Sequence, residues 1–403
     1  MQILFSVGRY CPTTNDLEFP LRELTARLAG AHEVAVATLV NHGDPDFLAR
    51  LKKPISPSTY SEAGCSMTVL QAPNSRRLLR NIYVSLAQME SFAGLQWPCF
   101  VAAYRGQLEQ LVGGAQLVHT VTGASQDLMR LTAQIAEKRG VPLIITPQLG
   151  FAEECHDLHQ TLARADGVVA LHEAEREWLV KGGVAQSKIE LIEIGYNMPA
   201  FPPRGAFRQR RDIAGPLVLF LGRKETERGY RAVLEAADRI WLRYPNAHFV
   251  FLGPSSPEAQ RDFLNWRGER RMIDLPAVDP RERAQILADC DLVCVPSLKE
   301  GLGLVYLETW SAARPLVAAD TSLERARIAD GEEGLLIPQD KNGVVEAVFK
   351  LIGNPALAQK LGAGGRRRVE QRHNWDAVTM KTAQFYERVL QQKLGSAAPL
   401  AAK

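Results

Sequence analysis

The 403-residue sequence has no excess of charge of either sign, because 48 Lys and Arg residues stand against 45 Asp and Glu residues and give a net charge of +3. This balance excludes a polyanion binder that works through net charge, so we expect no nucleic-acid partner. The six cysteines are scattered and include no Cys-x-x-Cys pair. Their spacing excludes a disulfide framework and a cysteine-based zinc site, and it favours a reduced, cytoplasmic location.

Long hydrophobic runs are also missing. An uncharged apolar run of about 18 residues would predict a membrane-spanning helix, and the sequence has none. The apolar start, residues 1–12, is too short for a signal peptide and fits a first buried strand. No Gly-x-Gly-x-x-Gly follows that strand, which argues against a dinucleotide-dependent dehydrogenase, and there is no P-loop.

What the sequence does have is a regular alternation of short apolar runs with longer amphipathic stretches. Apolar strands that alternate with helices indicate parallel sheets covered on both faces. In the first half we expect strands at Ile3–Val7, Val34–Thr38, Thr68–Gln71, Leu117–His119, Leu143–Thr146, Gly167–Ala170 and Ile189–Ile192. In the second half we expect them at Leu217–Leu221, His248–Leu252, Leu292–Val295, Leu316–Ala318 and Gly334–Ile337.

The alternation breaks once, between these two halves. Residues 197–216 carry four prolines and four arginines without periodicity, which is typical of a linker. We therefore predict a domain at 1–198, a linker at 199–216, a second domain at 217–375 and a final helix at 376–392. Each domain is expected to be a doubly wound α/β sheet that binds ligands beyond the carboxyl ends of its strands.

The most informative stretch is VPSLKEGLGLVYLETW, residues 295–310. A strand ends at Val295, and two glycines precede a helix whose free amides suit a phosphate. Glu300 and Glu308 would face the same pocket, where carboxylates accept hydrogen bonds from neutral sugar or ribose hydroxyls rather than from phosphate. The alternative is a solvated Glu300 and a Glu308 that interacts only with the helix dipole.

A second stretch, LVLFLGRKETERGYRAVLEA at 217–236, places Arg223 and Arg228 in a loop between Gly222 and Gly229. Forked arginine donors suit phosphate oxygens. A charged surface loop is an equally good interpretation from the chemistry alone, and Lys224 is a weaker candidate for the same phosphate.

Both stretches resemble the retaining GT-B glycosyltransferases of family 4. The resemblance rests on PSLKEGLGLVYLE and FLGRKETERGY, and further matching pieces are DLVCVPS, RPLVAAD, DGEEGLLIPQD and HNWDAV. It is specific in the second domain and weaker in the first. It implies two Rossmann-like domains that face a central cleft, with a nucleotide-diphosphate sugar on the second domain, the acceptor on the first, and a final helix that crosses back to the first.

The resemblance also assigns residues. Glu308 would hold the ribose hydroxyls, and Glu300 with the backbone of Gly301–Leu304 would contact the transferred sugar and the diphosphate. The phosphate-binding Arg and Lys of the family fall on Arg223 and Arg228. The expected catalytic residues are Glu300, Arg223 and Arg228, and the expected donor-binding residues are Gly222, Arg223, Arg228, Val278, Glu300, Gly301, Leu302, Gly303, Leu304 and Glu308.

The first domain departs from the family pattern in the loops expected to meet the acceptor. Residues 13–16 stand where the family often has a double glycine, and Gln148 stands where it often has a histidine. Asn15, Gln148 and the strand-end His119 are therefore the acceptor-side candidates. For His119 a structural role is the competing interpretation.

Two further patterns are weaker. His156 and His159 lie beside two glutamates, but without a further well-spaced ligand we expect no metal there. A basic group at Arg76, Arg77 and Arg80 lies on a predicted amphipathic helix. It leaves two interpretations open, peripheral contact with an anionic bilayer or a solvated helix face.

The sequence thus predicts a cytoplasmic, metal-independent, hexosyltransferase-type enzyme that needs no cofactor beyond its nucleotide-sugar co-substrate. It would move a sugar with retention of configuration to a hydroxyl of a sugar, lipid or small metabolite. One alternative is a GT-B sugar-nucleotide epimerase or hydrolase. The other is a catalytically impaired nucleotide-sugar-binding partner subunit.

Overall fold

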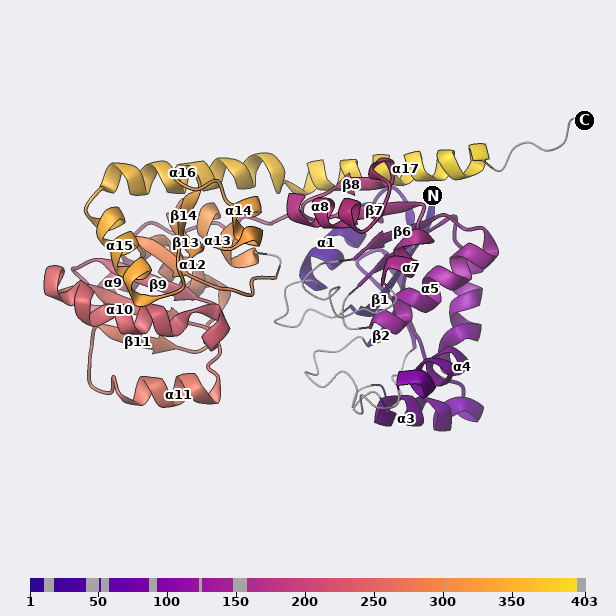
Figure 1. Cartoon of the computed structure of the whole chain (residues 1–403), viewed down its shortest axis with the longest axis horizontal. Coiled ribbons are helices and arrows are strands. Elements are labelled where there is room, and N and C mark those ends of the chain that lie inside the picture. Colours follow the sequence, from indigo (N-terminus) through magenta and orange to yellow (C-terminus); the bar gives the residue numbers. More distant parts are fainter. Residues whose placement is uncertain are drawn as a thin grey trace, which may run out of the picture. The chain divides into compact units, whose positions relative to one another are not determined.

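The computed structural model describes residues 1–10, 18–40, 51, 58–86, 93–122, 125–147, 158–301 and 303–396. The chain divides into two compact units, Met1–Gly195 with Trp375–Lys403, and Tyr196–Asn374. Both are parallel-sheet α/β domains (Figure 1), so the predicted pair of Rossmann-like doubly wound domains is confirmed. The cleft expected between them stays a prediction.

Unit 1 is built on an eight-stranded sheet with the order β3-β4-β2-β1-β5-β6-β7-β8. Its neighbouring strands are parallel except for the antiparallel pair β3 and β4. The strands are β1 (Gln2–Arg9), β2 (Glu33–Val40), β3 (Thr59–Glu62), β4 (Cys65–Val69), β5 (Leu117–Val121), β6 (Leu143–Thr146), β7 (Gly167–Ala170) and β8 (Ile189–Leu191). The helices are α1 (Glu18–Leu28), α3 (Arg77–Leu86), α4 (Ala93–Gly113), α5 (Gln126–Arg139), α7 (Leu158–Ala163), α8 (Glu173–Lys181) and α17 (Trp375–Ser396), with short 3-10 turns η1 (Asn74–Arg76) and η3 (Gln186–Lys188).

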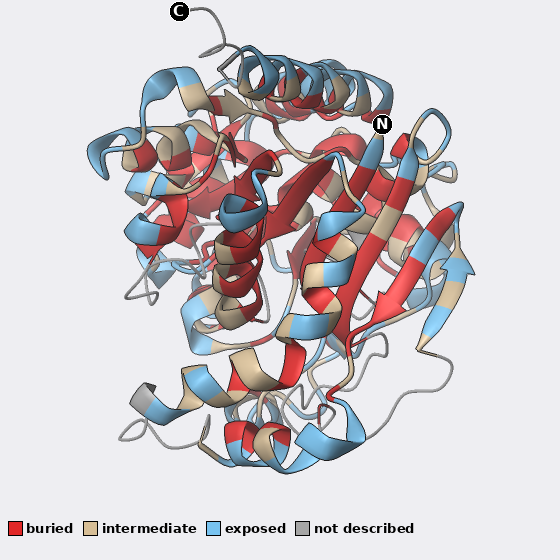
Figure 2. Ribbon diagram, turned by 90° about the vertical axis from the view of Figure 1, so that its right-hand side faces the viewer, coloured by how far each residue is buried: buried red, intermediate tan, exposed pale blue. Residues whose placement is uncertain are grey.

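Two apolar cores lie on opposite faces of this sheet, because successive side chains of a strand point to opposite sides. On β1, Leu4 belongs to the core formed with α4, α5 and α7, while Ile3 and Phe5 belong to the core formed with α1 and α17. The buried strands between these layers are visible in Figure 2. The C-terminal helix α17 thus completes unit 1 through Phe385 and Tyr386, which are buried against the sheet.

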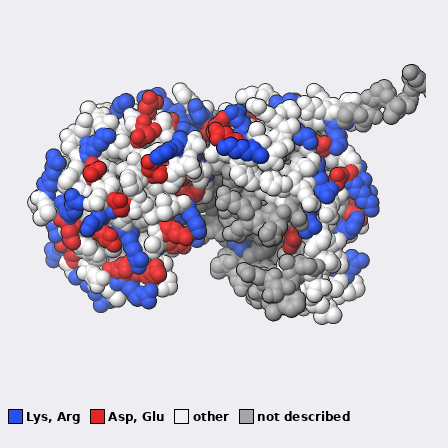
Figure 3. Space-filling view, in the orientation of Figure 1, with Lys and Arg blue, Asp and Glu red and all other residues white. Residues whose placement is uncertain are grey.

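Unit 2 is built on a six-stranded parallel sheet with the order β11-β10-β9-β12-β13-β14. Lys, Arg, Asp and Glu side chains are interspersed over the face of this unit drawn in Figure 3. Its strands are β9 (Leu217–Leu221), β10 (His248–Leu252), β11 (Met272–Leu275), β12 (Leu292–Val295), β13 (Leu316–Ala319) and β14 (Gly334–Ile337). Its helices are α9 (Ala206–Arg211), α10 (Tyr230–Arg243), α11 (Pro257–Leu264), α12 (Pro280–Asp289), α13 (Leu304–Ser311), α14 (Ser322–Arg327), α15 (Lys341–Ile352) and α16 (Pro355–Arg372), with a 3-10 turn η4 (Thr226–Arg228).

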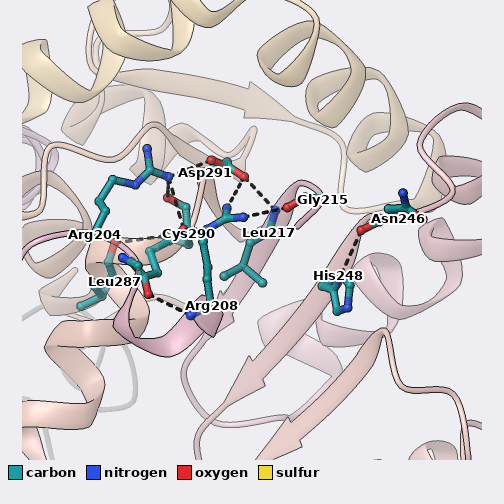
Figure 4. Close-up of polar contacts among 11 residues, drawn as sticks. Arg204, Arg208, Gly215, Leu217, Asn246, His248, Leu287, Cys290 and Asp291 are labelled. Carbon is teal, nitrogen blue, oxygen red and sulfur yellow. Dashed lines mark hydrogen bonds and ion pairs between the residues drawn. The ribbon is translucent and has the colours of Figure 1, made fainter. Parts of the chain in front are cut away.

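The segment predicted as a linker contains the helix α9, which packs against α12 of unit 2. The carboxylate of Asp289 accepts hydrogen bonds from the amides of Phe207 and Arg208 at 2.7 and 3.1 Å. Asp291 accepts from the side chains of Arg204 and Arg208 at 2.8 and 2.7 Å (Figure 4). The predicted linker segment 199–216 thus contains a short helix, which Asp289 caps and whose Arg208 is bound by Asp289 and Asp291 from far along the chain.

Several elements were not expected from the sequence. The amphipathic helix predicted at the basic group corresponds to α3, which begins at Arg77, and the long helix α4 that follows it was not predicted. Pro98 lies inside α4, and a proline within a sequence stretch usually argues against a helix there. The helix α16 contains three glycines within residues 362–365, which weaken a helical pattern. A Cβ atom at Gly365 would lie 1.9 Å from the Trp310 ring, so a glycine there lets α16 approach α13 closely.

Candidate donor-binding site

The strand order of unit 2 reverses between β9 and β12, since the chain builds outward from β9 to β11 on one side and from β12 to β14 on the other. In open parallel sheets the loops after two such strands border a ligand-binding crevice. Here these loops are residues 222–229 after β9 and residues 296–303 after β12. Each loop lies within one of the two sequence stretches that predicted the donor site.

Direct contacts hold these two loops together. The amide of Leu298 donates to the carbonyl of Glu227 at 2.9 Å, and Gln339 donates to the carbonyls of Glu227 and Pro296 at 2.9 and 2.8 Å. Gly229 has φ 80°, and a Cβ atom there would lie 2.4 Å from the carbonyl oxygen of Pro296. A glycine is therefore required where the loops meet. Gln339, which follows β14, lies in the matching piece DGEEGLLIPQD but was not singled out, because its local sequence does not show that it reaches these two loops.

Arg228 and Glu300 form a buried ion pair across the two loops. Nη1 of Arg228 donates to Oε2 of Glu300, and their side chains are 15% and 3% exposed. Nη1 of Arg327 donates to the backbone carbonyl of Glu300 at 3.1 Å. The structure thus brings together the predicted catalytic carboxylate and one of its two predicted arginines, and it adds Arg327, which the sequence analysis did not single out.

Glu308 lies on α13 and accepts a hydrogen bond from Nε of Arg283 at 3.0 Å and a second from Nη2 of the same side chain. Tyr196 lies near Glu308. The burial of Tyr196, and after it the negative charge of Glu308, raise the pKa of the Tyr196 hydroxyl well above its usual range. Glu308 is therefore a partly buried carboxylate at the helix that follows the phosphate-suited loop. Its pairing with Arg283 was not predicted, because Arg283 is on α12, 25 positions earlier.

The neighbouring cations Arg223 and Lys224 have opposite environments. The Arg223 side chain is 56% exposed and lies 3.5 Å from Glu225. Lys224 is fully buried: Nζ donates to the Asp274 carboxylate and to the carbonyl of Leu275 at 2.8 Å. Burial lowers the Lys224 pKa, and Asp274 opposes that shift. These contacts argue against the suggestion that Lys224 substitutes in phosphate binding, because its ammonium group is bonded to Asp274 and Leu275 of β11.

The remaining predicted donor residues lie at the same sheet edge. Gly222 follows β9 with φ 136°, and Gly303 has φ 71° and directly precedes Leu304, the first residue of α13. The first amides of any α-helix have no intrahelical acceptor, so this helix start can receive an anion. Gly301 is half-buried in the same loop, and the half-buried Val278 lies between β11 and α12. Leu302 is outside the described residues.

Of the acceptor-side candidates, only His119 is within the described residues; Asn15 and Gln148 are not. His119 is buried in β5, with Nδ1 2.5 Å from the Tyr386 hydroxyl and Nε2 2.8 Å from the Thr146 hydroxyl. Burial lowers its pKa to about 3, so the ring is neutral. These contacts tie α17 to the sheet and favour the structural interpretation of His119. It also lines a cavity of about 70 Å³ with predominantly apolar walls.

The weaker sequence patterns resolve differently. His159 stacks on Trp178 with ring centroids 5.6 Å apart, and His156 is outside the described residues. Among the residues that the structure describes, no group of three His, Cys, Asp or Glu side chains is arranged to hold a metal ion. The basic group is divided, because Arg80 is buried while Arg76 and Arg77 are exposed. Over the same residues, no helix combines the length and apolar character that crossing a bilayer requires.

Two family models match the chain. The model described as "Glycosyl transferase 4-like domain" matches residues 20–195, and the one described as "Glycosyl transferases group 1" matches residues 215–354. The first falls in unit 1 and the second in unit 2. The second match contains both loops at the strand reversal of the unit 2 sheet.

Curated relatives match over part of their length. A glycogen synthase of Mycobacterium tuberculosis is 28% identical over 211 residues, 51% of this chain and 49% of the relative. A phosphatidyl-myo-inositol mannosyltransferase of Mycolicibacterium smegmatis is 30% identical over 43% of this chain and 46% of its own. A D-inositol 3-phosphate glycosyltransferase of Streptosporangium roseum is 28% identical over 56% of each. The matched part of the chain thus spans about half the length of these relatives.

Solved structures match over almost the whole chain. HepE of Anabaena in complex with UDP has a TM-score of 0.71 and 16% identity, covering 96% of this chain and 100% of that one. Sucrose-phosphate synthase of Thermosynechococcus elongatus has a TM-score of 0.69 and 21% identity, covering 99% of this chain and 100% of that one. At these identities the likeness establishes the fold, and it confirms the predicted GT-B architecture.

Proposed function

We propose that this chain, which belongs to the group 1, family 4-like glycosyltransferases, transfers a hexose from a nucleotide-diphosphate sugar to a hydroxyl acceptor. The observation that carries the proposal is the buried Arg228–Glu300 pair at the strand reversal of unit 2, beside an anion-suited helix start. A carboxylate that accepts from sugar hydroxyls next to cationic and amide donors for phosphate matches the two halves of a sugar nucleotide.

Each predicted donor residue has a distinct role in this proposal. Glu308 accepts from the ribose hydroxyls in exchange for part of its pairing with Arg283. Glu300 orients hydroxyls of the transferred sugar. Arg223, Arg228 and the amides at Gly303–Leu304 neutralise the charge that grows on the diphosphate as it leaves. The neighbour HepE, solved with UDP and also with UDP-glucose, supports a donor of this class.

The transfer is proposed to retain the anomeric configuration through attack from the side of the leaving group. The acceptor oxygen bonds to the anomeric carbon while the bond from that carbon to the diphosphate oxygen breaks, and the acceptor's proton passes to that oxygen. Glu300 shares its loop with the diphosphate-binding amides, so it is poorly placed to attack the opposite face of the sugar. The acceptor is proposed to bind unit 1.

A thermal-shift screen of UDP-, GDP- and ADP-sugars tests donor binding, since a ligand at 100 times its dissociation constant stabilises a protein by about 2.7 kcal/mol. Proton NMR of the first product made with an accepted donor then gives its anomeric configuration. An inverted product would contradict the stereochemical proposal. Donor turnover that needs no acceptor would favour the epimerase or hydrolase alternative, and binding without turnover would favour an impaired partner subunit.

Metal independence is part of the same proposal, because Arg223, Arg228 and helix amides are assigned the charge neutralisation that a metal ion supplies elsewhere. We expect transfer to continue after treatment with EDTA. If EDTA abolishes sugar transfer and Mg²⁺ or Mn²⁺ restores it, a metal ion and not the arginines neutralises the charge of the leaving diphosphate. The control is a thermal melt in EDTA, which separates a catalytic effect from unfolding.

A further inference from the structure

Glu324 is a carboxylate buried beside the candidate donor site. It lies in the first turn of α14, directly after β13, and the residue is 1% exposed. The helix places it there because Thr321 caps the N-terminus and accepts from the Glu324 amide at 3.1 Å. A buried carboxylate loses its hydration, so its surroundings decide whether it carries a charge.

The groups that face Glu324 come from four elements: Arg327 on its own helix, Tyr306 on α13, Glu300 on the preceding loop and Arg228 on η4. Arg327 Nη1 lies 3.6 Å from Oε1 of Glu324. Among the described residues, neither Oε2 of Glu324 nor the buried Tyr306 hydroxyl has a hydrogen-bond partner. Burial, with Arg327 opposing, raises the pKa of Glu324 to about 7. A carboxyl that shares one arginine with Glu300 is therefore poised between its neutral and charged forms.

The charge of this cluster depends on one proton. When Glu324 is neutral, the positive charges of Arg228 and Arg327 are balanced only by the carboxylate of Glu300, and the cluster carries one net positive charge. When Glu324 is ionised, the two arginines face two carboxylates and the cluster is neutral. An anionic diphosphate bound at Arg228 favours the cluster with neutral Glu324. The diphosphate is attracted to the net positive charge of that form, and an ionised Glu324 would repel it; both interactions are strong between buried charges.

We propose that Glu324 is a positioning residue whose protonation is coupled to binding of the donor's diphosphate. The proposal rests on the proposed function, since it takes a nucleotide-sugar as the ligand of the Arg228–Glu300 pair. Coupling is reciprocal: the protonated cluster binds the donor more tightly, and the bound donor holds the proton on Glu324. Donor affinity therefore falls as pH rises through neutrality.

The test is calorimetric titration of the full-length protein with UDP-glucose, GDP-mannose and ADP-glucose between pH 6 and pH 9. Both phosphates of a nucleotide-sugar are diesters and stay ionised over this range, so the diphosphate adds no proton of its own. The uracil and guanine rings begin to titrate only near pH 9, and the adenine of ADP-glucose does not titrate in this range. We expect the affinity for the donor that binds to fall about tenfold from pH 6 to pH 9, the factor for a pKa displacement of one unit. Buffers of different ionisation enthalpy should report uptake of about half a proton near pH 7.5.

Two variants separate this role from a structural one. Glu324→Gln copies the neutral carboxyl and should keep the low-pH affinity while it loses the pH dependence and the proton uptake. The Tyr306 hydroxyl lies too far from Glu324, or at the wrong angle, for a full hydrogen bond, but it still lowers the Glu324 pKa. Tyr306→Phe removes it, so the midpoint of the pH dependence should move to higher pH. Glu346→Gln, an exposed site on α15, is the matched control and should behave as wild type.

The outcomes are distinguishable. Binding whose pH dependence is absent, or is unchanged in Glu324→Gln, overturns the coupling and leaves the proposed function intact. If none of the three sugar nucleotides binds at any pH, the donor proposal falls and the coupling with it. Loss of the pH dependence in Glu324→Gln together with an upward midpoint in Tyr306→Phe would establish the coupling.

Discussion

Arg228 and Glu300 are 72 positions apart in the sequence, yet Nη1 of the arginine donates to Oε2 of the glutamate. The pair lies in the loops beyond the carboxyl ends of β9 and β12 in unit 2. The pair exists because β9 and β12 are neighbours, so that their following loops meet. It links the residue assigned to the diphosphate with the residue assigned to the sugar. Loss of either partner is therefore expected to affect both folding and donor binding.

Replacing Arg228 tests this pair. Arg228→Ala leaves the 3% exposed Glu300 side chain without its cation, and we expect unfolding free energy to fall by about 2–4 kcal/mol. Sugar-nucleotide affinity should fall at least tenfold in the same variant, as measured by calorimetry below its melting temperature. Arg228→Lys keeps the charge and should recover most of both losses. Full donor affinity in Arg228→Ala would remove this arginine from the site.

Arg223 should behave differently, because its side chain is 56% exposed. Arg223→Ala is expected to leave unfolding free energy within about 0.5 kcal/mol of wild type while it lowers the turnover number. The control is Arg243→Ala, an exposed arginine in the last turn of α10, at the opposite edge of the sheet from the loops. Equal turnover in both variants would show that the phosphate assignment of Arg223 is wrong.

Glu308 is assigned to the ribose. Glu308→Ala should weaken binding of a nucleoside diphosphate by roughly 1.5–3 kcal/mol, the range for hydrogen bonds to a charged group. Glu300→Ala should weaken the sugar nucleotide more than the bare nucleoside diphosphate, because it contacts the sugar. Calorimetry with both ligands on both variants measures the contrast, and Glu282→Ala on α12 is the control. Unchanged nucleotide affinity in a folded Glu308→Ala protein would place Glu308 outside the site.

The buried Lys224 is expected to stabilise the fold and not to bind phosphate. Asp274→Asn removes the counter-charge of a lysine with no exposed side-chain surface, so we expect about 2–3 kcal/mol of destabilisation, less than for a fully buried pair because Asp274 is partly exposed. Donor affinity should stay within about twofold of wild type. Chemical denaturation and calorimetry give the two quantities. Weaker donor binding in Asp274→Asn without a loss of stability would indicate that Lys224 binds phosphate.

Glu324 should also make stability depend on pH. Its pKa in the folded protein is raised from 4.5 to about 7, so the folded state binds more protons than the unfolded state between these values and stability falls as pH rises through this window. The loss attributable to this one group is on the order of 2–3 kcal/mol. Denaturation at pH 5 and pH 8 measures it in wild type and in Glu324→Gln, in which the loss should shrink by that amount. An equal loss of unfolding free energy between pH 5 and pH 8 in both proteins would contradict a raised pKa of Glu324.

The amino-acid sequence by itself predicted two parallel-sheet units and most of their strands, because a buried strand needs only a short apolar run between turn residues. It also indicated the two loops of the candidate donor site, because glycines mark the loop after each of two such runs: Gly222 and Gly229 after β9, and Gly301 and Gly303 after β12. These signals are local, and they survive without knowledge of the fold.

Only the tertiary structure decided which charged side chains act at the surface and which act inside. Arg223 and Lys224 are adjacent in sequence, yet the first is exposed and the second is buried against Asp274, 50 positions later. The local sequence of 199–216 is typical of a linker, and its helix is held by Asp289 and Asp291, which are more than 70 positions away. The glycine-rich α16 is helical because its glycines allow it to pack against Trp310. Such pairings depend on strand order and on long-range packing, and no local pattern encodes them.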